Sequence, residues 1–322
     1  MQPSQLDKFE PVLEYVTTSA PLRISFVGGG SDLPAFYEKS KGAVLSSAIN
    51  KHIYVTVKRM GALYGANYRL NYSQTEIVDT IDEIQNSIAR ECLRLVPVQP
   101  PLYIGTVADV PASSGLGSSS CFAVALLKAL HLMRGEQVSD IQIAEEACYV
   151  EIEALERPVG KQDHYAAAFG GLNVIQFLPS GQVRLEPLPL SLKDVSQLFK
   201  HLLLFWTKIQ RDASSILSEQ KEGTANKMDT LKSMVEQVFE MQKLLNTDFA
   251  IQEFGEMLHL GWIRKQSLAS KITNPRINDW YQRARDAGAY GGKLCGAGGG
   301  GFLLFVAPPE KHDFIRQRLQ DL

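Results

Sequence analysis

Residues 111–121 read P-A-S-S-G-L-G-S-S-S-C and lie between two apolar segments of different character. The segment before them, Leu102–Val107, is short and apolar, as is typical of a strand. The segment after them, Phe122–Met133, is rich in Ala and Leu and contains no Gly or Pro, which favours a helix. Gly115 and Gly117 allow backbone angles that a Cβ would block. The sequence therefore predicts a strand, a tight glycine- and serine-rich loop, and a helix, in that order.

The start of this predicted helix is a candidate anion site. Free N–H groups and the positive end of the helix dipole point outward there, and phosphate binds readily to such an end. Ser118, Ser119 and Ser120 exceed the single hydroxyl that an N-cap needs. A serine-capped helix after a flexible turn is the alternative.

Composition bounds the class of protein. The chain has 322 residues, enough for about two domains, with 45% hydrophobic and 21% charged residues. The net charge of -2 gives no basic field for nucleic acid or for an anionic membrane. The composition shifts to Pro, Leu and Ser around residues 187–196, so we expect one domain over 1–190 and a second over 191–322.

The cysteines and the N-terminus indicate the compartment. Four cysteines are scattered without a CxxC pair, which predicts reduced thiols rather than a zinc or disulfide framework. Residues 1–15 lack the apolar core of a signal peptide, and no apolar run approaches membrane-spanning length. We expect a cytoplasmic protein with neither nucleic acid nor membrane as a partner.

A second glycine-rich segment follows the first predicted strand. Leu22–Val27 is apolar except for Arg23 and leads into Gly28-Gly29-Gly30-Ser31-Asp32, where the backbone can approach another group closely. Arg23 is a candidate functional cation and Asp32 a candidate functional carboxylate. The alternatives are a strand-edge charge and a helix N-cap. Further along, Val44–Ser47 and Ile53–Lys58 predict two strands.

Two more carboxylates stand out. The capping-box pattern at Ser139 opens a helix predicted to reach about Leu155, and its apolar stripe, with Ile141 at one end, contains Glu151. A carboxylate on a buried face needs a cation or a pairing Arg. Asp163 lies near the start of a short helix rich in small residues, where it could also be only an N-cap.

The glycine patterns exclude several enzyme classes. Gly296, Gly298 and Gly301 match GxGxxG as a string, but the strand Phe302–Val306 follows instead of a helix, so a dinucleotide-binding fold is rejected. No glycine loop carries the Walker A lysine, and HExxH and GxSxG are missing from the sequence. The remaining residues fit phosphoryl transfer, which needs a phosphate cradle, a metal ion and a group for the acceptor hydroxyl.

Three stretches together resemble the GHMP small-molecule kinase superfamily. They are P-L-R-I-S-F-V-G-G-G-S-D at 21–32, P-A-S-S-G-L-G-S-S-S at 111–120 and K-L-C-G-A-G-G-G-G-F at 293–302. The stretch V-G-K-Q-D-H-Y-A-A-A-F-G-G at 159–171 most resembles the heptose phosphate kinase branch, and residues 207–220 fit the same branch. L-fucose kinase domains look similar and are a rival.

The resemblance implies an α+β fold, with an N-terminal domain like ribosomal protein S5, a C-terminal ferredoxin-like domain, and ATP and sugar in the cleft. It implies that Asp163 is the catalytic carboxylate, that Arg23 lies beside it, and that Ser119 and Glu151 contact Mg²⁺. The residues implied to hold the ATP phosphates are Pro111, Ser113, Ser114, Gly115, Leu116, Gly117, Ser118, Ser119 and Ser120. Those expected toward the substrate are Gly29, Gly30, Ser31, Asp32, Lys161, Arg211, Gly298 and Gly299.

We therefore expect an ATP-dependent sugar kinase. The favoured acceptor is the anomeric hydroxyl of D-glycero-D-manno-heptose 7-phosphate, giving the 1,7-bisphosphate. The alternatives are an L-fucose or galactose kinase and a non-catalytic sugar or nucleotide sensor. A homodimer is one possible assembly. Two departures from the family pattern, His164 for the usual Gln and Lys208 for the usual Gly, bear on sugar recognition more than on the reaction.

Overall fold

The larger sheet is built around two long antiparallel strands, β1 (Tyr15–Val27) and β2 (Gly42–Arg59). The computed structural model describes residues 10–61, 63, 65–210, 214–247 and 249–322, and within them this sheet has seven strands. One half of β2 pairs with β6 (Leu172–Phe177) and the other half with β5 (Leu102–Ala108). The outer strands are β3 (Tyr68–Asn71), β4 (Thr75–Val78) and β7 (Val183–Pro187).

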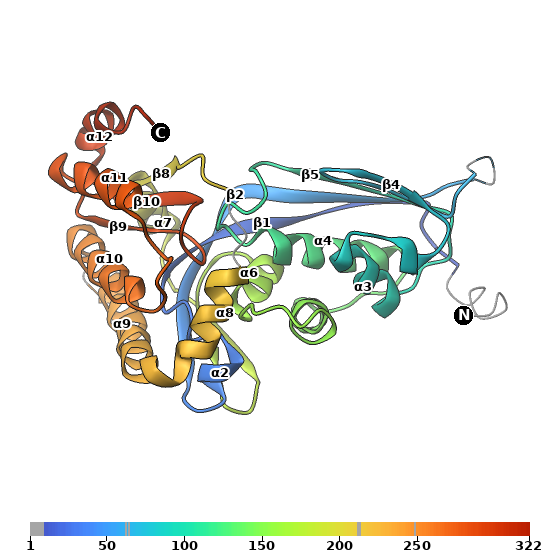
Figure 1. Cartoon of the computed structure of the whole chain (residues 1–322), viewed down its shortest axis with the longest axis horizontal. Coiled ribbons are helices and arrows are strands. Elements are labelled where there is room, and N and C mark those ends of the chain that lie inside the picture. The colour runs from blue at the N-terminus through green and yellow to red at the C-terminus, as the bar shows by residue number, and fades with distance from the viewer. Residues whose placement is uncertain (1–9, 62, 64, 211–213, 248) are drawn as a thin grey trace.

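Helices cover one side of this sheet, as Figure 1 shows. The central one, α4 (Ser118–Met133), is rich in Ala and Leu because it packs against β1 and β2 and against its neighbouring helices. Its neighbours are α3 (Ser87–Leu95), α5 (Asp140–Cys148) and α6 (Gln162–Phe169). A π-helix over Tyr149–Ala154 continues α5.

The C-terminal part has a smaller sheet with the order β8 (Leu202–Trp206), β10 (Phe302–Val306) and β9 (Gly291–Leu294). The helices described around it are α7 (Leu192–Lys200), α8 (Ser214–Gly223), α9 (Met228–Thr247), α10 (Ile251–Gln266), α11 (Pro275–Asp286) and α12 (His312–Arg318). The short helix α2 (Pro34–Tyr37) follows the first glycine segment.

One hydrophobic core joins the two parts. The rings of Phe26 in β1 and Phe254 in α10 meet edge to face, with centroids 5.3 Å apart. Burying such aromatic rings is among the larger gains in a core, so β1 and α10 hold each other in place. The domain boundary at residue 190 stays a prediction.

The predicted strand, loop and helix around residues 111–121 are confirmed, since β5 ends at Ala108 and α4 begins at Ser118. The two strands predicted at 44–47 and 53–58 are wrong in extent, because β2 runs through both. A register shift opposite Pro21 and Arg23 absorbs the polar residues between them, as a β-bulge does.

The helix predicted from Ser139 is also different in detail. It begins where predicted, and the Ser139 side chain accepts from the backbone N–H of Gln142. Ile141, in the first turn of α5, is 53% exposed rather than on a buried stripe. At the other end, the wider turn of the π-helix changes the directions of the side chains relative to an α-helix. Glu151 is nevertheless buried, as predicted. No helix in the part of the chain that the structure describes is long and apolar enough to cross a membrane.

Candidate active site

A cavity of about 480 Å³ lies where β1, α6, α10 and the loop before α4 meet. It is lined by parts of all three glycine-rich segments, which are far apart in the sequence. The predicted residues that line it are Arg23, Gly29, Gly30, Asp32, Ser113, Ser114, Gly115, Gly117, Ser118, Ser119 and Asp163. The cavity therefore gathers most of the residues that the sequence singled out.

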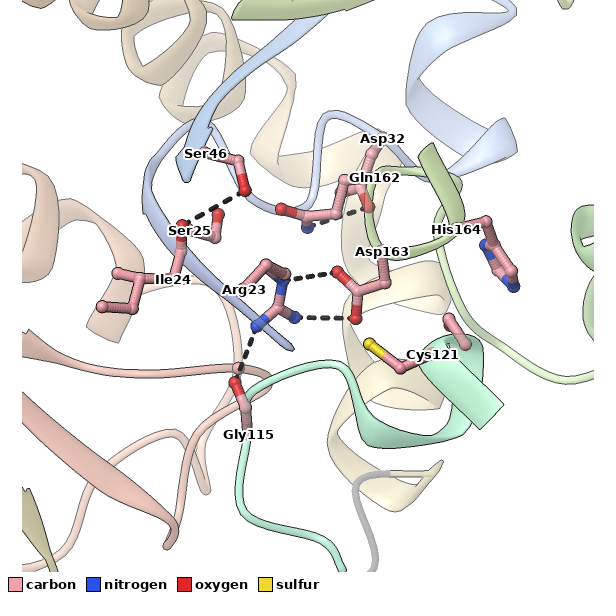
Figure 2. Close-up of polar contacts among 12 residues, drawn as sticks. Arg23, Ile24, Ser25, Asp32, Ser46, Gly115, Cys121, Gln162, Asp163 and His164 are labelled. Carbon is pink, nitrogen blue, oxygen red and sulfur yellow. Dashed lines mark hydrogen bonds and ion pairs between the residues drawn. The ribbon is translucent and has the colours of Figure 1, made fainter. Parts of the chain in front are cut away.

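Arg23 and Asp163 form a bidentate ion pair at this cavity, as Figure 2 shows. Nε and Nη2 of Arg23 each donate to one carboxylate oxygen of Asp163 at 2.7 Å, and Nη1 donates to the carbonyl of Gly115 at 2.9 Å. Burial opposes the charge of Arg23, but the Asp163 carboxylate outweighs it and raises the pKa of the guanidinium. Asp163 lies inside the first turn of α6, whose N-cap is Lys161, so it is not the cap.

The bulge in β1 and β2 explains how Arg23 reaches the cavity. Arg23 is the first paired residue after the register shift, opposite Ala48, and its backbone N–H donates to the carbonyl of Leu116. Bulges commonly re-aim a side chain next to an active site. Here the bulge lies beside the one basic residue of this strand and ties β1 to the serine-rich loop.

Asp32 is a second buried carboxylate in the cavity, 3% exposed. It accepts from the backbone N–H of Gly30 at 2.8 Å and from the side-chain amide of Gln162 at 2.9 Å (Figure 2). Burial, followed by the charge of Asp163, raises the pKa of Asp32. The N-cap of α2 is Leu33, so Asp32 is not a helix cap.

The serine-rich loop lines the cavity and contains hydroxyl groups without a hydrogen-bond partner among the described residues. Gly115 and Gly117 have φ near +80°, where a Cβ is unfavourable, and a Cβ at Gly115 would lie 2.6 Å from the carbonyl oxygen of Cys295. The buried hydroxyls of Ser114 and Ser118 have no hydrogen-bond partner among the described residues. Since an unsatisfied buried polar group is costly, the loop is suited to a polar ligand.

Glu151 lies behind the loop in a buried network rather than on the cavity wall. Its carboxylate accepts from Ser120 at 2.8 Å and Arg157 at 3.0 Å, and lies 2.9 Å from Nε2 of His164. Burial would raise the pKa of Glu151, but the His164, Ser120 and Arg157 contacts outweigh it and lower the pKa to about 2. Burial also opposes protonation of His164, whereas Cys148 and Glu151 raise the pKa of its imidazole. Glu151 is thus an ionised, fully enclosed carboxylate.

The other predicted site residues lie outside the cavity lining. These are Ser31, Pro111, Leu116, Ser120, Glu151, Lys161, Gly298 and Gly299. The Ser31 hydroxyl is bonded to the carbonyls of Gly28 and Ala43, and the ammonium of Lys161 donates to the carbonyl of Gly181. In the third glycine segment the lining residues are Gly296 and Ala297. Arg211 lies outside the described residues.

Sequence reasoning missed five polar residues of the cavity, namely Ser25, Arg157, Gln162, Gln220 and Lys265. Gln162 directly precedes the predicted site residue Asp163, and this adjacency was the signal that could have identified it. Arg157 follows a helix end, and Lys265 follows Arg264 near the end of a polar-looking helix, where solvent exposure is the usual expectation. The part of the chain that the structure describes contains no group of three or more His, Cys, Asp or Glu that could hold a metal ion.

Comparison with known proteins agrees with this geometry. The family model for the GHMP kinase N-terminal domain matches residues 76–171, and the model for the GHMP kinase C-terminal domain matches residues 241–322. A D-glycero-alpha-D-manno-heptose 7-phosphate kinase of Campylobacter jejuni is 30% identical over 94% of this chain and 93% of its own length.

Two further relatives are informative. A bifunctional fucokinase/GDP-fucose pyrophosphorylase of Arabidopsis thaliana is 28% identical over 94% of this chain, which spans 31% of that larger protein. The crystal structure of a D-glycero-D-manno-heptose 1-phosphate kinase from Bacteroides thetaiotaomicron superposes with a TM-score of 0.76 at 25% identity, covering 95% of this chain and 92% of the other. With both family models matched, a full-length relative at 30% identity and the same two-part fold, the chain belongs to the GHMP kinase family.

Proposed function

We propose that this kinase transfers the γ-phosphoryl group of ATP to the anomeric hydroxyl of D-glycero-D-manno-heptose 7-phosphate. The observation that carries the reaction type is the Arg23–Asp163 pair, which lies in one cavity with the serine-rich loop. A phosphate cradle beside an oriented carboxylate is the arrangement that phosphoryl transfer to a hydroxyl needs.

In the proposed step the sugar hydroxyl donates a hydrogen bond to the Asp163 carboxylate. Its oxygen attacks the γ-phosphorus, the bond from that phosphorus to the β–γ bridging oxygen breaks, and ADP leaves. The hydroxyl proton passes to Asp163. Arg23 holds the carboxylate through two hydrogen bonds of 2.7 Å, which leaves oxygen lone pairs on Asp163 for the hydroxyl. Orienting the acceptor in this way is the main service a protein provides in such a reaction.

Asp32 is suited to bind sugar hydroxyls. Gln162 and the Gly30 N–H fix its carboxylate at the cavity wall, and a polyol offers many donors to such a group. The loop of Ser113–Ser119 is suited to the nucleotide phosphates through its backbone N–H groups and free hydroxyls.

For Mg²⁺ we propose Ser119, which lines the cavity, and Glu151 as protein ligands. A hydroxyl and a carboxylate are hard oxygen donors, and Mg²⁺ usually takes one or two carboxylates together with substrate phosphates and water, so the donor set fits. Binding at Glu151 requires Arg157, whose side chain is 35% exposed and lines the cavity, to give up Oε1. When bound, the ion would neutralise charge on the phosphates.

The choice of acceptor rests on similarity to the Campylobacter relative and to the Bacteroides structure, whose names place the acceptor's phosphate at different positions. Arg211 remains our prediction for the acceptor's own phosphate, because a guanidinium forks onto phosphate. Lys161 is a weaker choice, since its ammonium is bonded to Gly181 and lies 5.2 Å from the ring centroid of Tyr37.

The test is ATP consumption by the purified protein with heptose 7-phosphate, heptose 1-phosphate, L-fucose, galactose and mevalonate, followed by NMR of the product. We expect the highest kcat/KM with heptose 7-phosphate and a new phosphate on the anomeric carbon. Activity confined to mevalonate would contradict a sugar acceptor.

The second candidate is an L-fucose kinase, which the similarity to the bifunctional fucokinase/GDP-fucose pyrophosphorylase of Arabidopsis favours. The same panel separates it from the heptose kinase. A null result with every acceptor would instead favour a non-catalytic sensor. A cytoplasmic location and a homodimer stay predictions.

A further inference from the structure

Lys265 is a buried cation in the wall of the proposed active site. It lies one residue before the end of α10 and is 6% exposed, yet it lines the same cavity as Asp163 and the serine-rich loop. Its ammonium donates to the carbonyl of Gly296, in the third glycine segment. That bond uses one of its three donors and leaves two.

Among the described residues, Lys265 differs from the other two cations of this cavity in having no carboxylate partner. Arg23 is paired with Asp163, and Arg157 is paired with Glu151. No carboxylate of the described chain lies within 4.0 Å of the Lys265 ammonium. Burial lowers the pKa of Lys265 to about 8, and Arg23 acts in the same direction, while Asp32 and Asp163 act against it.

The position of this ammonium relates it to the phosphate cradle. Gly296 packs directly on Gly115, since a Cβ at Gly296 would lie 2.5 Å from the Gly115 Cα. Gly115 in turn accepts from Arg23. Lys265 is therefore bonded to the residue that packs on the turn of the serine-rich loop, and the same turn accepts from Arg23.

A buried ammonium without a counter-charge is costly unless a ligand supplies one. Lysine is a usual phosphate ligand, as a point charge. We propose that Lys265 binds a phosphate group in the cavity, either the phosphoryl group transferred from ATP or a phosphate carried by the sugar. This proposal rests on the proposed kinase function. In the first case, the C-terminal part of the chain supplies the lysine that the serine-rich loop lacks.

The experiment compares the wild type with Lys265→Met, Lys265→Arg and Lys243→Met, the last removing an exposed lysine on α9. Calorimetry measures the affinity for ADP, for the non-hydrolysable analogue AMP-PNP and for heptose 7-phosphate. Steady-state assays measure kcat and KM for ATP with heptose 7-phosphate and with unphosphorylated heptose.

A charged hydrogen bond of this kind corresponds to a loss of about 10- to 100-fold. If Lys265 binds the transferred group, Lys265→Met loses affinity for AMP-PNP but not for ADP, and kcat falls with both acceptors. If it binds the sugar's phosphate, only the affinity and KM for heptose 7-phosphate change, and the preference over unphosphorylated heptose disappears. In both cases Lys265→Arg recovers part of the loss and Lys243→Met behaves as wild type.

Thermal unfolding separates binding from a purely structural role. If Lys265 only holds Gly296, Lys265→Met lowers the melting temperature and leaves all affinities unchanged, which overturns the proposal. We expect an equal or higher melting temperature without ligand, because an unpaired buried charge is removed, and a smaller rise on adding AMP-PNP or heptose 7-phosphate. A wild type that binds these ligands but phosphorylates no acceptor would contradict the proposed function alone. A wild type that binds neither would overturn this inference as well.

Discussion

Replacing Asp163 by Asn tests the centre of the proposed mechanism, because it removes one charge and hardly changes the side-chain volume. In the proposed step the Asp163 carboxylate receives the hydroxyl proton, and both of its oxygens accept from Arg23. A general base typically contributes about 10²–10⁴-fold to a rate. We therefore expect Asp163→Asn to lower kcat by about that factor, with little change in the affinity for ATP.

The same substitution has a cost in stability that the structure lets us bound. The Arg23 side chain is 4% exposed and that of Asp163 is 23% exposed. Removing one partner of a buried ion pair costs about 3–5 kcal/mol, and partial solvation of Asp163 places the expected value near 3 kcal/mol. Domains are usually stable by about 5–15 kcal/mol, so the variant should remain folded and its loss of kcat cannot come from unfolding.

The measurements are kcat from ATP consumption and the free energy of unfolding from urea titration at pH 7. Asp313→Asn is the matched control, because its ion pair with Arg316 is exposed and such pairs contribute about 0–1 kcal/mol. Near-normal turnover by folded Asp163→Asn would refute its role as the base. A stability loss no larger than that of Asp313→Asn would refute the reasoning about the buried pair.

Three further substitutions test the rest of the site. Glu151→Gln should raise the Mg²⁺ concentration needed for half-maximal activity, and an unchanged metal titration would leave Glu151 a structural role only. Because the contacts with His164, Ser120 and Arg157 lower the pKa of Glu151 to about 2 from an ordinary 4.5, its ionisation stabilises the fold above pH 4.5. That contribution is lost as the pH falls toward 2, so the difference in unfolding free energy between wild type and Glu151→Gln should shrink below pH 4.5. Gly115 has φ +81°, and a Cβ there would lie 2.6 Å from the Cys295 carbonyl oxygen. Gly115→Ala should therefore lower the unfolding free energy by more than about 1 kcal/mol and weaken AMP-PNP binding. The control Gly61→Ala, at a position with open space around it, should do neither. Asp32→Ala should raise KM for the sugar and leave KM for ATP unchanged; the opposite pattern in steady-state kinetics would place Asp32 at the nucleotide.

Local patterns predicted the elements of the site well but not which of two neighbouring residues faces it. Ser119 and Ser120 are equivalent in the sequence pattern, yet one lines the cavity and the other bonds Glu151. Successive residues on a helix are about 100° apart, so the rotation of α4 decides this, and that rotation depends on packing against β1 and β2. Glu151 was recognised as buried from periodicity, but a π-helix that periodicity does not predict sets its direction.

Long-range contacts explain what the sequence could not predict. Lys265 stands in a helix end with ordinary polar neighbours, and its burial arises only because α10 packs against the third glycine segment. The network of Glu151 and His164 likewise joins two helices. Neither contact leaves a periodic or spacing signal. By contrast, Arg23 and Asp163 could be placed together only through the resemblance of their two segments to the kinase family.

The third glycine motif, residues 293–302, joins the C-terminal part of the chain to β1. The buried ammonium of Lys293 donates to the carbonyls of Ser25 at 2.6 Å and Phe26 at 2.8 Å, across 268 and 267 residues of sequence. Burial, with the charge of Lys265, lowers the pKa of Lys293 well below its ordinary value. The hydrogen bonds to β1 therefore have to compensate for the cost of burying this amine.

The same motif also fixes the position of the serine-rich loop. Gly296 packs on Gly115 and accepts from Lys265, so one short segment sets the distance between β1, the serine-rich loop and α10. Its glycines are needed because backbone meets backbone there: a Cβ at Gly296 would lie 2.5 Å from the Gly115 Cα, and one at Gly301 would lie 2.4 Å from the Ser114 carbonyl oxygen. Because the motif lies between β9 and β10, which pair with each other, the small C-terminal sheet holds this wall of the cavity in place.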